Sequence, residues 1–201
     1  GDLMAVLLLG EVMGGVLNKD ATAKAVGPVQ ALGEVTVLCA GAHTGRLSRM
    51  LGEPMPLETE RGYHTQIMRP GISMRHSIIW PARAIMVTPT AGGIRVGGTV
   101  EMAGLDAAPD YRRSKITVKR AIEALPNLRC EDFTEWMGHR PAFPDTVPVM
   151  SASAKVPGVF YATGHGHLGV TYAATNARLM ADLISGATPP IDMRPYRVDR
   201  F

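Results

Sequence analysis

The sequence has few of the features that define several classes of protein. It carries only two cysteines, Cys39 and Cys130, which fits a reducing compartment and provides neither a disulfide framework nor the ligand spacing of a zinc site. No apolar run is long enough to span a bilayer, and no run of five like charges occurs, although the formal net charge is +3. The basic residues are scattered, so we expect no nucleic-acid partner.

The composition that remains, with 46% hydrophobic and 19% charged residues, is that of an ordinary globular protein. Residues 3–13 are expected to form a helix. The continuous apolar run 35–40 predicts a strand buried on both faces, followed by a turn at 41–45 and a short helix at 46–51.

The centre of the chain changes to short strand candidates separated by proline, glycine and arginine, which predicts an antiparallel sheet. An amphipathic helix is expected at 111–125, with Ile116, Ala121, Ile122 and Leu125 on its apolar side. A Pro-rich connection at 143–150 leads to the last part of the chain. The strand candidates are 62–69, 77–80, 84–88, 94–100 and 133–139, and a hairpin turn is expected at 91–93.

The run Gly164-His165-Gly166-His167-Leu168-Gly169 lies between a strand candidate at 159–162 and a helix candidate at 172–184. Its glycines let backbone approach a ligand closely, and the start of a helix presents unpaired N–H groups at the positive end of its dipole. The run matches the dinucleotide fingerprint GxGxxG, but no strand with an acidic residue follows. It therefore indicates the last βα unit of a cofactor domain, and the missing strand argues against a nicotinamide enzyme.

A second βα unit is expected near the start of the chain. Ala40, Gly41 and Ala42 follow the apolar strand, and the carboxyl end of a buried parallel strand is where nucleotides bind. The alternative is a turn of small residues that serves packing. Cofactor-domain pieces thus lie on both sides of an antiparallel insert.

Arg140 is the candidate for binding a carboxylate. Pro141 favours extended backbone at Arg140, so Trp136, Gly138 and Arg140 share one face of a strand. Glycine leaves space there, tryptophan offers an apolar wall, and a guanidinium binds a carboxylate in bidentate geometry. The alternative is a structural ion pair between Arg140 and an acid such as Asp145.

His165 and His167 stand two residues apart, but no third ligand has convincing spacing, so we expect turn or pocket histidines and no metal site. Tyr63, within Arg61-Gly62-Tyr63-His64, could hydrogen-bond a substrate or could support the sheet as a strand aromatic.

Several motifs occur in an order that resembles the C-terminal half of FAD-dependent D-amino-acid dehydrogenases, within the wider D-amino-acid oxidase and glycine oxidase family. The resemblance covers residues 35–201. The motifs are CAGAHTGRL (39–47), PLETERGYH (56–64), GGIRVGGTVEMAGLD (92–106), WMGHRPAFPDTVPVM (136–150) and FYATGHGHLGVTYAATNARLMADLISG (160–186).

The resemblance implies a mixed α/β (α+β) fold in which 1–56 and 141–201 are parts of a Rossmann-like FAD-binding domain. Residues 57–140 would form an inserted antiparallel β-sheet domain that binds the substrate. Such enzymes open with a βαβ unit that carries GxGxxG and a ribose-binding acid, and neither occurs before residue 35. We therefore expect this chain to correspond to the C-terminal half of such an enzyme.

The resemblance also implies roles for single residues, with FAD as the cofactor. Arg140 matches the family's carboxylate binder, Tyr63 would lie on a strand that lines the substrate cavity, and His165 would lie close to the flavin; these are the catalytic candidates. The helix that starts near Val170 would direct its N-terminus at the flavin N1 and C2 carbonyl. The cofactor-binding candidates are Ala40, Gly41, Ala42, Gly164, Gly166, His167, Leu168, Gly169, Val170 and Thr171.

The implied reaction is oxidation of a D-amino acid to an imine, with hydride transfer from Cα to flavin N5 and later hydrolysis to a 2-oxo acid and ammonia. Two alternatives stay open: a secondary amine such as sarcosine or a proline derivative as substrate, and a non-catalytic fragment. Oxygen, a quinone or a carrier protein could accept the electrons. Other expected partners are the N-terminal half of the same enzyme or a second copy of this chain. We expect the protein in the cytoplasm or at the periphery of the inner membrane.

Overall fold

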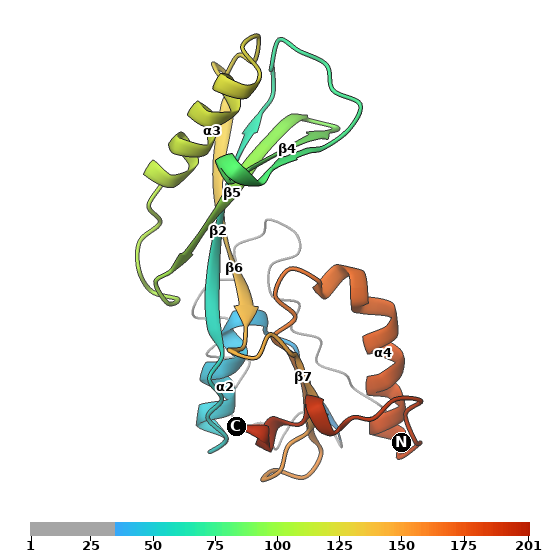
Figure 1. Ribbon diagram of the computed structural model, residues 1–201. Helices are drawn as coiled ribbons and strands as arrows, with labels where there is room; N and C mark the ends of the chain where they lie inside the picture. Colours follow the sequence, from blue (N-terminus) through green and yellow to red (C-terminus); the bar gives the residue numbers. More distant parts are fainter. Residues whose placement is uncertain (1–34) are drawn as a thin grey trace. The chain divides into compact units, whose positions relative to one another are not determined.

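The computed structural model describes residues 35–201, and the helix expected at 3–13 lies outside the described residues (Figure 1). Those residues divide into two compact units. The split unit comprises residues 35–59 together with Arg140–Phe201, and the insert unit comprises Glu60–His139. The assignment of FAD-binding and substrate-binding roles to 1–56, 57–140 and 141–201 stays a prediction.

The split unit contains a three-stranded sheet with the order β1-β8-β7. Strand β1 (Thr36–Leu38) is buried along its whole length and pairs in parallel with β8 (Val159–Thr163), which confirms the two predicted strands. Strand β7 (Val149–Ala152) pairs antiparallel with β8. Strand β7 begins inside the range 143–150, for which the sequence predicts a Pro-rich connection, because its four residues carry too little periodicity to stand out beside Pro148.

Short helices follow β1: the 3-10 helix η2 (Gly41–His43) and the α-helix α2 (Thr44–Met50). Strand β8 leads into α4 (Gly169–Ser185), which ends at Gly186 in the left-handed conformation. Only Leu179 and Met180 of α4 are buried, in a cluster with Val37 and Met150 of the sheet. The helix is therefore anchored to the sheet through its C-terminal half.

Two 3-10 helices, η4 (Arg194–Tyr196) and η5 (Val198–Arg200), close the described chain. Val198 joins a second core cluster with Leu38, Val149 and Tyr161, and its N–H donates to Ser151 Oγ on β7 (3.0 Å). The C-terminal residues are thus part of the core of the split unit.

The other sheet is five-stranded with the order β3-β4-β5-β2-β6, which confirms the predicted antiparallel sheet. A 3-10 helix, η3 (Pro81–Arg83), joins β3 to β4. From Arg140 on, the residues of β6 belong to the split unit. The strands are β2 (Glu58–Ile67), β3 (Ile78–Trp80), β4 (Ile85–Thr90), β5 (Gly93–Met102) and β6 (Phe133–Ala142).

Helix α3 (Arg112–Ala124) lies against this sheet and packs mainly on β5 (Figure 1). The helix buries Ser114, Thr117 and Ala121, so small side chains let it approach the strands closely. Ile116 and Ile122 were expected on the packed side, but they are 51% and 37% exposed, and that prediction is wrong. Within residues 35–201, no helix has both the length and the apolar character needed to cross a membrane.

Candidate functional site

The two predicted cofactor-binding segments meet at one edge of the three-stranded sheet. Because β1 and β8 are parallel, the segments that follow them, Ala40–Ala42 and Gly164–Gly169, leave the sheet at the same edge. Thr163 Oγ1 donates a hydrogen bond to the carbonyl of Gly41 (3.0 Å) and ties one segment to the other.

The end of β6 joins the same edge. The N–H of Gly166 donates to the carbonyl of Pro141 (2.8 Å), and Ala142 forms an antiparallel bridge with His165. Arg140, which directly precedes Pro141, is half-buried. The fold therefore brings the backbone of the predicted carboxylate binder beside the glycine run, although the two are over 20 residues apart in the sequence.

The Phe143 ring packs against the first glycine of the glycine run. Gly164 has φ +83°, and a Cβ atom there would lie 2.2 Å from a ring carbon of Phe143, so a side chain at this position would collide with the ring. Phe143 is 3% exposed and stacks on Phe201 at 5.1 Å between ring centroids. Sequence reasoning missed this role, since nothing local in Pro-Ala-Phe-Pro marks the phenylalanine.

The acid named as an alternative partner of Arg140 is engaged by another arginine. Asp145 Oδ2 accepts a hydrogen bond from Arg200 Nε (2.8 Å), and this bond lowers the pKa of the Asp145 carboxyl. The Arg200 guanidinium also lies over the rings of Phe143 and Phe201, at 5.3 and 4.3 Å from their centroids. These contacts hold the C-terminal residues against Phe143 and so against the glycine run.

The exposed part of the site is the start of α4. Gly166 has φ +52°, and a Cβ atom there would have no atom within 4 Å, so its backbone faces open space. His167, Leu168, Val170 and Thr171 are exposed. The first N–H groups of a helix have no acceptor within the helix, and Leu168 provides no side-chain cap for α4. This turn therefore has N–H donors and the positive end of the helix dipole on its exposed side.

His165 is half-buried, and its Nε2 atom is buried without a hydrogen-bond partner in the part of the chain that the structure describes. Burial lowers the pKa of the imidazole, so the ring is neutral at pH 7. A neutral imidazole can donate or accept one hydrogen bond at that nitrogen. Among residues 35–201, no group of three or more His, Cys, Asp or Glu side chains is arranged to hold a metal ion.

The three candidates after β1 differ from one another. The side chains of Ala40 and Ala42 are buried, at 5% and 7% exposure, whereas Gly41 is half-exposed and a Cβ atom there would meet no atom within 4 Å. Only backbone atoms of this segment are available to a ligand. The small residues thus serve two purposes: the two alanines pack inside the protein, and the glycine allows close approach to its backbone.

Tyr63 lies in the insert unit, 2% exposed. Its hydroxyl donates to Glu101 Oε2 (2.5 Å) and accepts from the N–H of Asp110 (3.0 Å). Burial, with the hydrogen bond to Glu101, raises the pKa of the phenol. Arg61, fully buried, approaches the same carboxylate at 3.4 Å. This polar network inside the sheet favours the interpretation of Tyr63 as a supporting strand aromatic.

The vacant side-chain position at Gly138 is filled by a neighbour on the same strand. A Cβ atom on Gly138 would lie 1.9 Å from a ring carbon of Trp136, so the indole lies directly over the glycine. The ring also lies 5.0 Å from the ring of His64 on β2. We expected Gly138 to leave space beside the Arg140 guanidinium and Trp136 to form an apolar wall there. The Trp136 ring instead occupies the space at Gly138.

A βα edge with a glycine run and a helix start is typical of a cofactor-binding protein of the α/β class. Comparisons with known proteins identify the family. The family model described as FAD dependent oxidoreductase (DAO) matches residues 5–183. The chain is 38% identical over 186 residues to a D-amino-acid oxidase of Bradyrhizobium diazoefficiens, covering 89% of this chain and 44% of the relative. It is 30% identical over 203 residues to a D-amino acid dehydrogenase of Paramagnetospirillum magneticum, covering 99% and 46%.

Among solved structures, glycine oxidase from Geobacillus kaustophilus matches with a TM-score of 0.71 at 20% identity, over 85% of this chain and 46% of that one. This likeness confirms the mixed α/β fold. The chain belongs to the DAO family of FAD-dependent oxidoreductases, which confirms the resemblance drawn from the sequence motifs. It spans less than half the length of the relatives named here.

The residues at the sheet edge fit a flavin nucleotide. Gly41 and Gly166 expose backbone where a Cβ atom would enter open space, and the start of α4 offers N–H donors. The buried Nε2 of His165 is a polar atom that a ligand could satisfy. Each of these features is expected where a planar, electron-rich group lies against backbone.

Proposed function

We propose that this chain supplies the flavin-facing edge and the carboxylate-binding arginine of an enzyme that oxidises D-amino acids to 2-oxo acids. The observation that carries the proposal is the junction of β6 with the glycine run, made by the Gly166–Pro141 hydrogen bond and the Ala142–His165 bridge. The substrate class is taken from the relatives, which are named as a D-amino-acid oxidase and a D-amino acid dehydrogenase.

FAD, when bound, would accept a hydride from the substrate Cα. The backbone of Ala40–Ala42 and of Gly164–Thr171 would hold it. The N–H groups at the start of α4 would stabilise negative charge that develops near them, because preorganised donors need no reorganisation during the reaction.

Arg140 would bind the substrate carboxylate and orient the Cα–H bond. A guanidinium stays charged throughout the working pH range and matches a carboxylate with two parallel hydrogen bonds. Neutral His165 would offer a single hydrogen bond close to the reacting centre without adding a competing positive charge. No side-chain base is required when the substrate amine binds in its neutral form.

The Arg140→Met variant tests this role in the flavin-loaded protein. We expect KM for D-alanine to rise by about 100-fold, because a charge-assisted bidentate contact contributes about 3 kcal/mol. Arg95→Met, on the exposed side of β5, is the matched control and should keep the kinetics of the unchanged protein. Equal KM values for the Arg140 variant and its control would refute the carboxylate role.

A substrate comparison separates D-amino acids from the alternative class. Turnover of D-alanine should exceed that of sarcosine and of L-proline in the same assay, with an artificial electron acceptor to remove any dependence on the natural one. Faster turnover of sarcosine or proline would assign the secondary-amine reaction to the same site and overturn the proposed substrate.

A further inference from the structure

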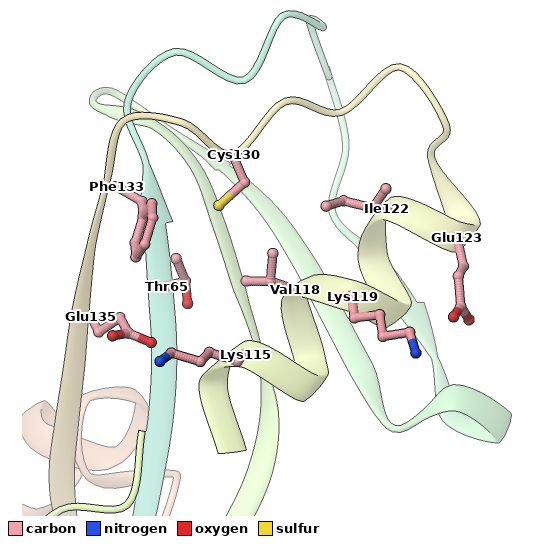
Figure 2. A pocket seen from close by; sticks show the side chains of 9 residues that line it. All are labelled: Thr65, Lys115, Val118, Lys119, Ile122, Glu123, Cys130, Phe133 and Glu135. Carbon is pink, nitrogen blue, oxygen red and sulfur yellow. The ribbon is translucent and has the colours of Figure 1, made fainter. Parts of the chain in front are cut away.

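The insert unit contains a cavity of its own, of about 490 Å³, between helix α3 and strands β2 and β6. Figure 2 shows the side chains that line it. This volume falls within the range of small-molecule binding sites, which is about 300–1,000 Å³. The lining residues are Thr65, Lys115, Val118, Lys119, Ile122, Glu123, Cys130, Phe133 and Glu135.

One end of the cavity is apolar. Val118 and Ile122 of α3 face Cys130 and Phe133 across it (Figure 2). Ile122 and Phe133 remain 37% and 43% exposed, although both are large apolar side chains. Covering them with a hydrocarbon group would remove apolar surface from water, which favours binding.

The floor of the cavity carries a hydrogen-bonding group that lacks a partner. Thr65 is 1% exposed, and its Oγ1 atom is buried without a hydrogen bond to any of residues 35–201. A buried hydroxyl without a hydrogen-bond partner destabilises the folded protein. A ligand atom that accepts or donates here would offset that destabilisation.

The charges around the cavity favour an anion. Lys115 and Lys119 lie one helical turn apart on α3, and neither makes an ion pair within the described part of the chain. The two carboxylates at the cavity are already engaged: Glu123 Oε2 is 2.8 Å from Arg83 Nη1, and Glu135 accepts a hydrogen bond from Ser114 Oγ. With the Glu123–Arg83 pair neutral, the lining of the cavity carries two ammonium groups and one further carboxylate, that of Glu135.

We propose that this cavity binds a small carboxylate with an aromatic or branched hydrocarbon body. The hydrocarbon body would lie between Ile122 and Phe133, and the carboxylate would accept hydrogen bonds from Thr65 Oγ1 and the Lys115 ammonium. In Figure 2 the hydroxyl of Thr65 and the ammonium of Lys115 lie at the same end of the cavity, with Glu135 beside them. The proposal rests on the insert unit alone and is independent of the flavin chemistry proposed above.

Cys130 reports occupancy directly, because its thiol lines the cavity whereas the other cysteine, Cys39, lies in the split unit. The full chain is alkylated with limiting N-ethylmaleimide in a concentration series of 3-phenylpropanoate, and both cysteines are quantified by peptide mass spectrometry. We expect saturable slowing of alkylation at Cys130 with an apparent Kd in the millimolar range, and an unchanged rate at Cys39.

Two companion molecules test the chemistry of the ligand. 3-Phenylpropan-1-ol keeps the hydrocarbon body without the charge, and L-phenylalanine adds an ammonium group that the two lysines would repel. Both should protect Cys130 more weakly than 3-phenylpropanoate does. Protection by the alcohol or by phenylalanine as strong as that by 3-phenylpropanoate would overturn the assignment of an anionic ligand.

Variants tie the effect to the named side chains. Thr65→Val keeps the shape of the side chain and should raise the apparent Kd by about fivefold, because one hydrogen bond is lost. Lys115→Gln, at an exposed position of α3, removes the ammonium group that the proposal places on the carboxylate and is expected to raise the apparent Kd by about threefold. Lys155→Gln, in the split unit, should have no effect. Absence of saturable protection at Cys130, equal slowing at Cys39, or unchanged Kd values in the Thr65 and Lys115 variants would each refute the proposal.

Discussion

At the scale of single residues, Gly164 and Gly166 show how two glycines in one run answer different requirements. Both have positive φ, but a Cβ atom at Gly164 would collide with the Phe143 ring at 2.2 Å, whereas one at Gly166 would enter open space. The first glycine is thus required by packing inside the protein. The second leaves backbone accessible on the side where we propose the flavin.

We therefore expect Gly164→Ala to lower the free energy of unfolding by about 3 kcal/mol, from overpacking together with a left-handed backbone. Gly166→Ala should lower it by only about 1 kcal/mol, from the backbone alone, and should weaken FAD binding more strongly than it weakens the fold. Urea unfolding followed by circular dichroism, together with fluorescence titration with FAD, measures both effects. Equal losses of stability in the two variants would contradict this division.

His165 predicts a pH dependence. Because burial lowers its pKa in the folded state, the unfolded chain binds this proton more readily. The contribution of His165 to stability is therefore fully present above the pKa of an unfolded histidine, about 6.5, and is lost as the pH falls below it. Chemical unfolding at a series of pH values should show this decline, and His165→Gln should reduce it. A steeper decline in the glutamine variant would show that the imidazole is stabilised in its charged form instead.

At the scale of structural elements, a buried carboxylate connects the helix after β1 to the β7–β8 hairpin. Glu53, 6% exposed, follows α2 and accepts hydrogen bonds from the N–H of Ala154 and the hydroxyl of Tyr161, each at 2.7 Å, as well as from the Ser153 hydroxyl. Three donors compensate its removal from water. No sequence pattern marked Glu53, since its partners lie about 100 residues further along the chain.

Glu53→Ala should lower the free energy of unfolding by about 3 kcal/mol, because the buried donors of Ser153 and Tyr161 would lose their acceptor. Tyr161→Phe alone should cost about 1 kcal/mol. The double variant should cost less than the sum, which a double-mutant cycle in urea would show. Strict additivity would mean that Glu53 and Tyr161 act independently.

At the scale of the whole molecule, the described residues build separate cores in the two units. Ile67, Val87 and Val96 belong to the core of the insert unit, whereas the cores of the split unit gather around Val149 and Met150, and no residue belongs to both sets. Each unit therefore has its own source of hydrophobic stability.

Hydrogen exchange should reveal this division. Ile67→Ala should remove about 3 kcal/mol of protection from amides within Glu60–His139, since it leaves a cavity in that core, and should leave β1 and β8 protected. Val149→Ala should produce the converse pattern. Mass spectrometry of exchanged peptides distinguishes these patterns from a uniform loss of protection, which would indicate a single cooperative unit.

The sequence by itself determined the local elements and the family. The apolar run around β1, the alternating strands of the insert and the glycine run before α4 each carry their signal within a short window, because backbone propensity and hydrophobic periodicity are local properties. The order of the motifs then identified a relative of D-amino-acid dehydrogenases, and the family match agrees.

Tertiary structure alone decided which faces are buried and which distant groups meet. The approach of α3 through Ser114 and Thr117 leaves Ile122 beside an open cavity, against the apolar periodicity of the helix. The bond from Gly166 to Pro141 and the engagement of the Tyr63 hydroxyl by Glu101 also depend on partners distant in sequence. Such pairings follow from how the chain packs, and packing is set by shape and by hydrogen-bond satisfaction throughout each unit.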